Sequence, residues 1–296
     1  MYESVLIPLD GSSAAEISLP YAEEIAAKFN SEIILLSVSA PTADDKDRLY
    51  HSYLDGIAEN VQGRLEARMG KEKVRVKTEV VFGKSASEIL RYADEGNVSL
   101  IAMASRGLSG HGPWLLGHVA GKVLRAAEIP VLLVRPSADK AVSKEGALVK
   151  KILLPLDGSK VGEAAIPCVE SLALTLNAEI VLLQIIKLSA LVASEGAAMS
   201  SAMIREEEEF KRASAVAYLK DIEKNLLAKG LKTAIAVGSG SPADQIIDFA
   251  ETNSIDLIAM STHGRSGIGR WVFGSVTDKV LHSGDTSVLT VRAKKD

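Results

Sequence analysis

The chain has 296 residues, 47% of them hydrophobic and 24% charged, and its 34 Lys and Arg against 38 Asp and Glu give a net charge of −4. This length suits two domains of about 150 residues each, and the apolar content excludes wholesale disorder. A mildly acidic chain is a poor candidate for sequence-independent binding to nucleic acid, because such binding depends on neutralising phosphates with Lys and Arg.

The same numbers bear on compartment and chemistry. Cys168 is the only cysteine, so an intrachain disulfide and a cysteine-based metal site are excluded. The first residues show no basic stretch followed by an apolar one, so we expect no signal peptide. Apolar runs such as 33–36 are far shorter than the roughly 18 residues that a membrane span needs. We therefore expect a cytoplasmic protein that does not associate with membranes.

Strand-like and helix-like segments alternate through the first half of the chain. Apolar runs predict strands at 3–9, 31–38, 74–81, 98–104 and 130–135. Helical patterns fill the intervals at 12–29, 45–70, 85–96 and 117–127. Most of the strand runs are continuous, which is typical of parallel strands buried on both faces. The alternation predicts a doubly wound α/β sheet, in which ligands bind beyond the carboxyl ends of the strands where the winding direction reverses.

A polar stretch follows Pro136 and predicts a linker over 137–148. The expected domains are therefore 1–136 and 149–296.

The second half repeats the first. The segment 5–12 returns at 152–159, an offset of 147, and the segment 100–103 returns at 257–260, an offset of 157. The second copy thus carries ten extra residues between these motifs, and repeats of this length are duplicated domains. Its strands are expected near 150–156, 178–186, 231–237, 255–261 and 286–292.

An aspartate follows the first strand of each copy, at Asp10 and Asp157, before Gly-Ser and a helix. A carboxylate there can accept hydrogen bonds from a ribose hydroxyl or an adenine amino group. It can equally cap the helix that follows. The residues of one copy alone do not separate the two interpretations.

A glycine-containing loop follows the fourth strand of the second copy. Gly264 and Gly274 flank it, and Ser275 is expected to begin a helix with Asp278 completing a capping box. Glycines let the backbone approach a ligand closely, and the free N–H groups of a helix start suit phosphate. The alternative is a structural loop whose glycines only turn the chain.

Here both copies resemble domains of the universal stress protein family. Nucleotide-binding members of that family carry Gly-x-x-Gly, nine residues, then Gly-Ser/Thr. The second copy matches at Gly264, Gly274 and Ser275, with Ser261 where the first glycine is expected. The stretches 155–159 and 240–243 also resemble the family, and the resemblance covers nearly all of both halves.

The resemblance implies a five-stranded parallel sheet in the order 3-2-1-4-5 in each half and one ATP pocket per domain, with Mg²⁺ as a possible companion of ATP. The residues expected by position to contact adenosine in the second half are Pro155, Asp157, Ile185 and Met260. Those expected at the phosphates are Ser261, Gly264, Gly274, Ser275 and Val276, and His263 lies in the same loop. The matching positions of the first half are Pro8, Asp10, Val38, Met103, Ala104, Gly107, Gly117, His118 and Val119.

The first half departs from the family pattern. His118 stands where the pattern has Ser or Thr, Ala104 stands for the first glycine, and Gly121 stands where the second half has Asp278. We therefore expect ATP mainly in the second half and a degraded site in the first. The competing hypothesis is that a protonated His118, helped by Arg106 or Lys84, still attracts an anion.

No residues stand out as catalytic or metal-binding. The chain has no Gly-x-Ser-x-Gly elbow, no P-loop and no metal-ligand spacing of histidines. The favoured function is an ATP-binding protein of signalling or stress response, in which any hydrolysis is slow. The alternatives are a slow Mg²⁺-dependent ATPase or nucleotidyl transferase, and a nucleotide-free scaffold that acts through protein partners.

The predicted fifth strands would leave apolar sheet edges that need covering. The resemblance implies pairing of two domains through this strand, so the tandem chain is expected to form a pseudo-dimer of its own two halves. A homodimer of chains is a further possibility, and the sequence does not identify protein partners.

Overall fold

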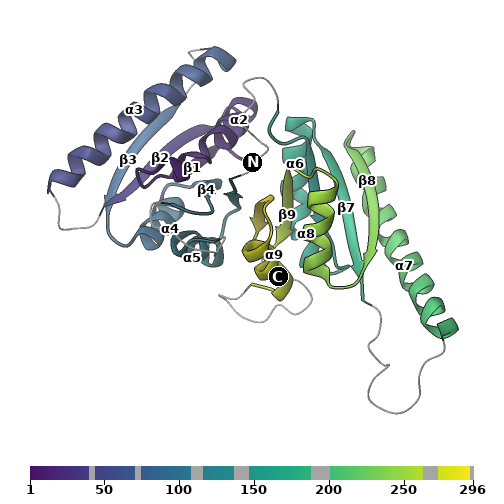
Figure 1. Ribbon diagram of the computed structural model, residues 1–296. Coiled ribbons are helices and arrows are strands. Elements are labelled where there is room, and N and C mark those ends of the chain that lie inside the picture. Colours follow the sequence, from purple (N-terminus) through teal and green to yellow (C-terminus); the bar gives the residue numbers. More distant parts are fainter. Residues whose placement is uncertain are drawn as a thin grey trace.

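The computed structural model describes residues 1–39, 44–70, 75–107, 116–136, 147–187, 201–262 and 273–293. Both halves belong to one ten-stranded sheet with helices on its two faces (Figure 1). The elements of the N-terminal half are β1 (Ser4–Pro8), α1 (Ser13–Glu16), α2 (Leu19–Phe29), β2 (Glu32–Ser39), α3 (Asp44–Met69), β3 (Val76–Phe82), α4 (Ser85–Glu95), β4 (Leu100–Ala104), α5 (His118–Ala126) and β5 (Val131–Val134). Those of the C-terminal half are β6 (Lys151–Pro155), the 3₁₀ helix η2 (Gly162–Ala165), α6 (Ile166–Leu176), β7 (Glu179–Ile186), α7 (Ser201–Ala228), β8 (Lys232–Ser239), α8 (Pro242–Thr252), β9 (Leu257–Ser261), α9 (Ser275–Ser283) and β10 (Ser287–Val291).

The strand order confirms the predicted fold class. The N-terminal half has the order β3-β2-β1-β4-β5, and the C-terminal half has β8-β7-β6-β9-β10, which is the same 3-2-1-4-5 arrangement. Within each half all neighbouring strands are parallel. The winding direction therefore reverses between β1 and β4, and again between β6 and β9.

The two halves join through their fifth strands. β5 and β10 pair antiparallel, with Leu132 opposite Leu289 and Val131 opposite Thr290. Each half thus covers the apolar edge of the other, and no strand of this central pair is left exposed along its hydrogen-bonding side. The predicted pairing of the two copies within one chain is what the strand register shows.

Two apolar layers sandwich the sheet, and each extends across both halves. One packs α2, α3, α6 and α7 on one face, with Leu54 and Leu219 fully buried in it. The other packs α4, α5, α8 and α9 on the opposite face, with Val123 and Val280 fully buried. α3 and α7 are the long outer helices at the two ends of the molecule in Figure 1.

One expected helix is interrupted. The pattern predicted a single helix over 12–29, whereas the structure has α1 and α2 separated at Ile17 and Ser18. Pro20 lies in the first turn of α2, where its missing N–H is tolerated, but within a continuous helix its ring would clash with the preceding turn. The Ser18 hydroxyl closes the break by donating to the carbonyl of Ala15 at 2.8 Å.

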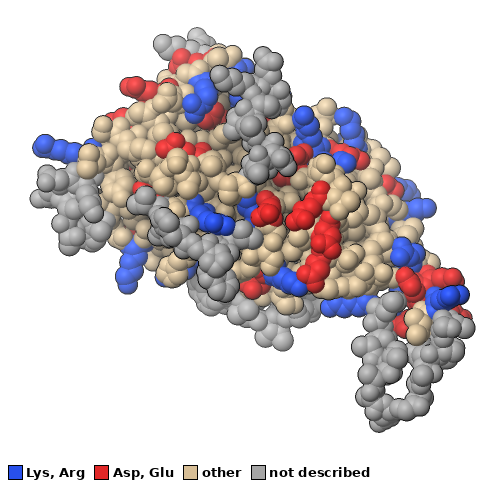
Figure 2. Space-filling view, in the orientation of Figure 1, with Lys and Arg blue, Asp and Glu red and all other residues tan. Residues whose placement is uncertain are grey.

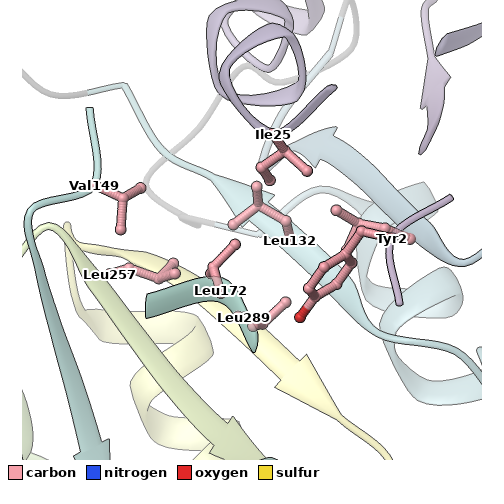
Figure 3. A pocket seen from close by; sticks show the side chains of 8 residues that line it. Tyr2, Ile25, Leu132, Val149, Leu172, Leu257 and Leu289 are labelled. Atoms are coloured by element: carbon pink, nitrogen blue, oxygen red, sulfur yellow. The ribbon is translucent and has the colours of Figure 1, made fainter. Parts of the chain in front are cut away.

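A small apolar cavity of about 10 Å³ lies where the halves meet (Figure 3). Its lining consists of four pairs of residues that occupy equivalent positions in the two copies: Tyr2 and Val149, Ile25 and Leu172, Leu100 and Leu257, Leu132 and Leu289. The Tyr2 hydroxyl donates to the carbonyl of Cys168 at 3.2 Å, and burial raises the pKa of Tyr2 well above its usual range. The cavity therefore marks the pseudo-twofold axis of the duplicated fold.

Charged side chains are distributed over the surface drawn in Figure 2, with broad areas of other residues between them. On the face drawn in Figure 2, Lys and Arg are scattered among Asp and Glu over both halves. Among the described residues, no helix has both the length and the apolar character that crossing a bilayer requires.

Candidate functional site

The carboxyl ends of three neighbouring strands meet at the winding reversal of each half. In the C-terminal half these are β9, β6 and β7, which bring Ser261, Pro155 and Ile185 to the same edge of the sheet. α9 begins beyond the same edge, at Ser275. In the N-terminal half the corresponding strands β4, β1 and β2 bring Ala104, Pro8 and Val38 together, and α5 begins at His118.

The aspartate after the first strand has the same geometry in both halves. Asp157 Oδ1 accepts from the Ser159 amide at 3.0 Å and from its hydroxyl at 2.6 Å, and that hydroxyl oxygen accepts from the Gly162 amide at 3.0 Å. The Asp10–Ser12 pair repeats this arrangement at 3.1 and 2.6 Å, and Ser12 caps α1. The serine is therefore the residue that contacts the free amide of the next turn, and the aspartate orients the serine.

The other carboxylate oxygen of Asp10 lies against the loop that follows β4. A Cβ atom placed on Gly107 would overlap Asp10 Oδ2, and one placed on Gly117 would lie 3.1 Å from the Ser105 carbonyl oxygen. A side chain at Gly107 would therefore displace the Asp10 carboxylate, and one at Gly117 would press on the backbone of Ser105. In this half the predicted phosphate loop and the predicted ribose acceptor are in direct contact.

Equivalent hydrogen bonds close the loop at its base in the two halves. The Gly117 amide donates to Ser105 O at 2.7 Å, and the Gly274 amide donates to Thr262 O at 3.0 Å. The first bond within α9 then runs from the Asp278 amide to Gly274 O at 2.9 Å. The amides of residues 275–277 precede that bond, so they are the groups that a helix start offers to an anion.

The expected capping box is wrong. Gly274 is the N-cap of α9 and Ser275 its first helical residue, with no side-chain hydrogen bond at the cap. α9 does begin at Ser275, as expected, but its N-cap is Gly274, because the Gly274 carbonyl accepts the first intrahelical bond. Asp278 instead lies 3.7 Å from the Arg125 guanidinium of the other half. α5 also begins after a glycine cap, Gly117, so Gly121 does not mark the loss of a cap.

One anchor of the helix start is present only in the C-terminal half. The buried Thr277 hydroxyl donates to Ser261 O at 3.0 Å and ties the first turn of α9 to the end of β9. The equivalent residue of α5 is Ala120, which has no polar side-chain atom. The two helix starts therefore share a backbone arrangement but differ in how firmly side chains hold them.

The remaining predicted positions divide by burial. Met103, Ala104, Met260 and Ser261 are buried at the ends of β4 and β9. Pro8, Val38, Val119, Pro155, Ile185 and Val276 are half-buried, while His118 and Ser275 are exposed at the helix starts. His263 and Gly264 lie outside the described residues.

Acidic groups surround the first turns of both halves. The Tyr53 hydroxyl donates to Glu16 at 2.9 Å, and the equivalent Tyr218 donates to Glu163 at 2.9 Å. Burial, together with Glu16 and Asp10, raises the pKa of Tyr53 well above its usual range, so this phenol remains a hydrogen-bond donor. In the described part of the chain no three acidic, histidine or cysteine side chains gather as metal ligands.

Two arginines that join the halves were not predicted from the sequence motifs. Arg135, directly after β5, donates to Leu281 O at 2.6 Å at the end of α9. The equivalent Arg292 lies 3.4 Å from Ala126 O at the end of α5. The recurrence of an arginine at the end of both fifth strands was a signal that could have identified this exchange.

Comparison with known proteins agrees with these features. The model of the universal stress protein family matches residues 1–135 and 149–292. The chain is 32% identical over 151 residues to universal stress protein MJ0531 of Methanocaldococcus jannaschii, covering 50% of this chain and 85% of that protein. It is 24% identical to universal stress protein Slr1230 of Synechocystis, covering 98% of this chain and all of that protein. The crystal structure of a universal stress protein from Archaeoglobus fulgidus has the same fold, with a TM-score of 0.69 at 21% identity over 99% of each chain. These matches confirm the family resemblance of the repeated motifs.

Proposed function

The chain belongs to the universal stress protein family, and from that premise we propose that it binds ATP in its C-terminal half and acts in signalling or stress response. The observation that carries the proposal is the start of α9. The amides of residues 275–277 precede the first intrahelical bond and lie at the winding reversal of the sheet, with Ser275 as the first helical residue and Thr277 anchoring the turn. The partial positive charge of such a helix start favours a phosphate group.

The proposed difference in nucleotide binding between the halves depends on one side chain at each helix start. Ser275 places a small hydroxyl beside the amides of α9, whereas His118 places an imidazole beside those of α5. We propose that the larger imidazole leaves phosphate oxygens less room to approach the amides of α5. We therefore propose a nucleotide, with or without Mg²⁺, in the C-terminal half and a weak site in the N-terminal half.

The junction supports the proposal that the two halves of one chain act together as a pair of domains. Pairing of β5 with β10 gives two domains in the relation that the family resemblance implies for two separate chains. We propose a cytoplasmic location, where ATP is available and where the lone buried thiol of Cys168 would stay reduced.

The test is calorimetric titration of ATP into the full chain and two matched variants, Gly274→Val and Gly117→Val. A branched side chain at either cap would cover the amides that follow it. We expect Gly274→Val to abolish the principal binding event and Gly117→Val to leave it unchanged. Equal loss in both variants would contradict the assignment to the C-terminal half.

The same samples separate binding from turnover. After incubation with ATP and Mg²⁺, we expect the bound nucleotide to be recovered as ATP, even when the incubation is much longer than the time that ATP stays bound. Steady release of ADP that Gly274→Val abolishes would identify a slow ATPase instead. Absence of any ATP binding by the unmodified chain would favour the scaffold alternative.

A further inference from the structure

An arginine of the N-terminal half reaches the helix start of the other half. Arg125 lies near the end of α5, and its Nη2 is 3.7 Å from Asp278 Oδ1 on α9. Its guanidinium carbon also lies 5.4 Å from the centre of the Phe273 ring. α5 and α9 are the two helices that flank the junction on this face (Figure 1). Arg125 is therefore in contact with a domain to which it does not belong.

The two residues that Arg125 contacts lie directly before and directly after the stretch of chain proposed to bind the phosphates. Phe273 directly precedes the cap Gly274, and its side chain is only 7% exposed. Asp278 directly follows Thr277, the last of the three residues whose amides precede the first intrahelical bond. An interaction with both residues fixes the turn from either side without occupying the place of the ligand. This is the arrangement expected of a group that positions a binding site.

The N-terminal half also holds the other end of the same helix. Arg135 is 4% exposed and donates to Leu281 O at 2.6 Å and to Val280 O at 3.4 Å. Burial lowers the pKa of Arg135 to about 10, so the guanidinium is still charged at neutral pH and suits the negative end of the α9 dipole. α9 is thus held at both ends by the N-terminal half.

Among the described residues, the N-terminal half supports the start of α9, but the C-terminal half does not support the start of α5 in the same way. The position equivalent to Arg125 is His282, whose Nδ1 lies 2.7 Å from Asp278 O in its own helix. The position equivalent to Asp278 is Gly121, which has no carboxylate. At the helix ends, by contrast, the exchange is mutual, because Arg292 contacts Ala126 O and pairs with Glu128 at 3.3 Å.

We infer that Arg125 is a positioning residue for the ATP phosphates in the C-terminal half, so that the N-terminal half supports binding in its neighbour while binding nucleotide weakly itself. The inference rests on the proposed ATP function. The side chains of Arg125 and Asp278 are 41% and 48% exposed, so their ion pair contributes little to overall stability. Its effect is expected in the affinity for the phosphates.

The test compares ATP with adenosine on the full chain, using Arg125→Ala, Asp278→Ala and the double variant. Arg91→Ala is the matched control, because Arg91 on α4 pairs only with Glu88 and Glu95 of its own helix among the described residues. We expect Arg125→Ala and Asp278→Ala each to weaken ATP binding about three- to tenfold, as one ion pair and one cation–π contact allow. The double variant should be no weaker than Arg125→Ala, and adenosine affinity should stay unchanged in all four.

Two results would overturn the inference while leaving the proposed function intact. One is an Arg125→Ala variant that binds ATP as the Arg91→Ala control does. The other is tighter ATP binding by Asp278→Ala, because that result would show that the net charge near the phosphates, and not the contact between Arg125 and Asp278, governs the affinity. Failure of the unmodified chain to bind ATP removes the proposed function first. If Arg125→Ala does not fold, Arg125→Gln carries the same comparison.

Discussion

The two halves share a main-chain frame and differ in the side chains placed on it. The Asp-Ser turn, the loop closure and the glycine cap recur with hydrogen-bond lengths that agree within 0.3 Å. The side chains at the two helix starts, however, differ. The C-terminal half has Ser275, Thr277 and Asp278 at the positions where the N-terminal half has His118, Ala120 and Gly121. The sheet needs the same main-chain arrangement in both copies. A single ligand site, by contrast, would need the particular side chains of the helix start in only one copy. A duplicated domain can therefore change the side chains at a helix start without changing its fold.

A second difference concerns the acids beneath the junction. Glu23 is buried and accepts two bonds from Arg64, at 2.9 and 2.7 Å. Its counterpart Glu170 pairs with Lys229 at 2.7 Å and is more exposed. Glu24 is buried beside it and accepts from the Leu148 amide, while Ser171 occupies the equivalent place in the C-terminal half. The N-terminal half thus anchors the chain where the second copy begins, and the described residues of the C-terminal half show no equivalent contact.

The largest effect that we expect tests the similarity of the halves. Leu132 and Leu289 are each 2% exposed and lie opposite each other across the junction. Truncation of either to Ala removes buried methyl groups and enlarges the cavity, which should lower the free energy of unfolding by about 2–5 kcal/mol. Denaturant titration should give the same loss for both variants. A clear inequality would show that the junction is not energetically symmetric.

The next effect tests whether the difference at the helix start can be reversed. Changing His118→Ser together with Ala104→Ser gives the N-terminal half the residues that the C-terminal half has at these positions. Because the backbone amides of α5 are already in place, we expect ATP affinity of this half to rise at least about tenfold, or ~1.4 kcal/mol. Calorimetry should then report a second binding event. Persistence of a single event would show that other residues of this half also prevent binding.

The sequence predicted the fold more completely than the site. The strands were predictable because continuous apolar runs occur in both copies. The predicted range 98–104 contains the observed β4, and the predicted range 255–261 contains the observed β9. The start of α9 at Ser275 was predicted correctly, whereas the capping box was wrong, because a glycine cap has no side chain to signal it and the Gly274 amide bonds to the carbonyl of Thr262, twelve residues earlier. The contact of Arg125 with Asp278 was not predictable from either copy alone, because it exists only once the two copies are packed together. The ligand contacts themselves remain predictions.

A smaller effect concerns the anchor of α9. Thr277→Ala removes the buried hydrogen bond to Ser261 O and makes the position like Ala120. One such bond contributes about 1 kcal/mol to stability. We expect a loss of that size in the free energy of unfolding and weaker ATP binding. The reverse change, Ala120→Thr in the other half, is the matched control and should leave ATP affinity unaltered.

The smallest effect that we expect is a pH dependence confined to one half. Glu24 is 8% exposed, and burial raises its pKa even though the amides of Leu148 and Val149 and the charges of Arg68 and Lys28 oppose the rise. A carboxyl whose pKa is higher in the folded state binds its proton more tightly there. The resulting stabilisation is complete below the unfolded pKa and is lost as pH rises through the folded pKa.

Glu24→Gln removes this titration. The free energy of unfolding of the unmodified chain should therefore rise relative to that of Glu24→Gln as the pH falls from neutral toward 4.5, the ordinary value for this carboxyl. Denaturant titrations of both proteins across this range measure the difference. Ser171→Ala, at the equivalent position of the C-terminal half, should differ from the unmodified chain by the same amount at every pH, because serine does not titrate. A difference for Glu24→Gln that runs the other way would mean that the junction amides outweigh burial, and that the ionised carboxylate, not the neutral acid, is the form that the N-terminal half uses to hold Leu148.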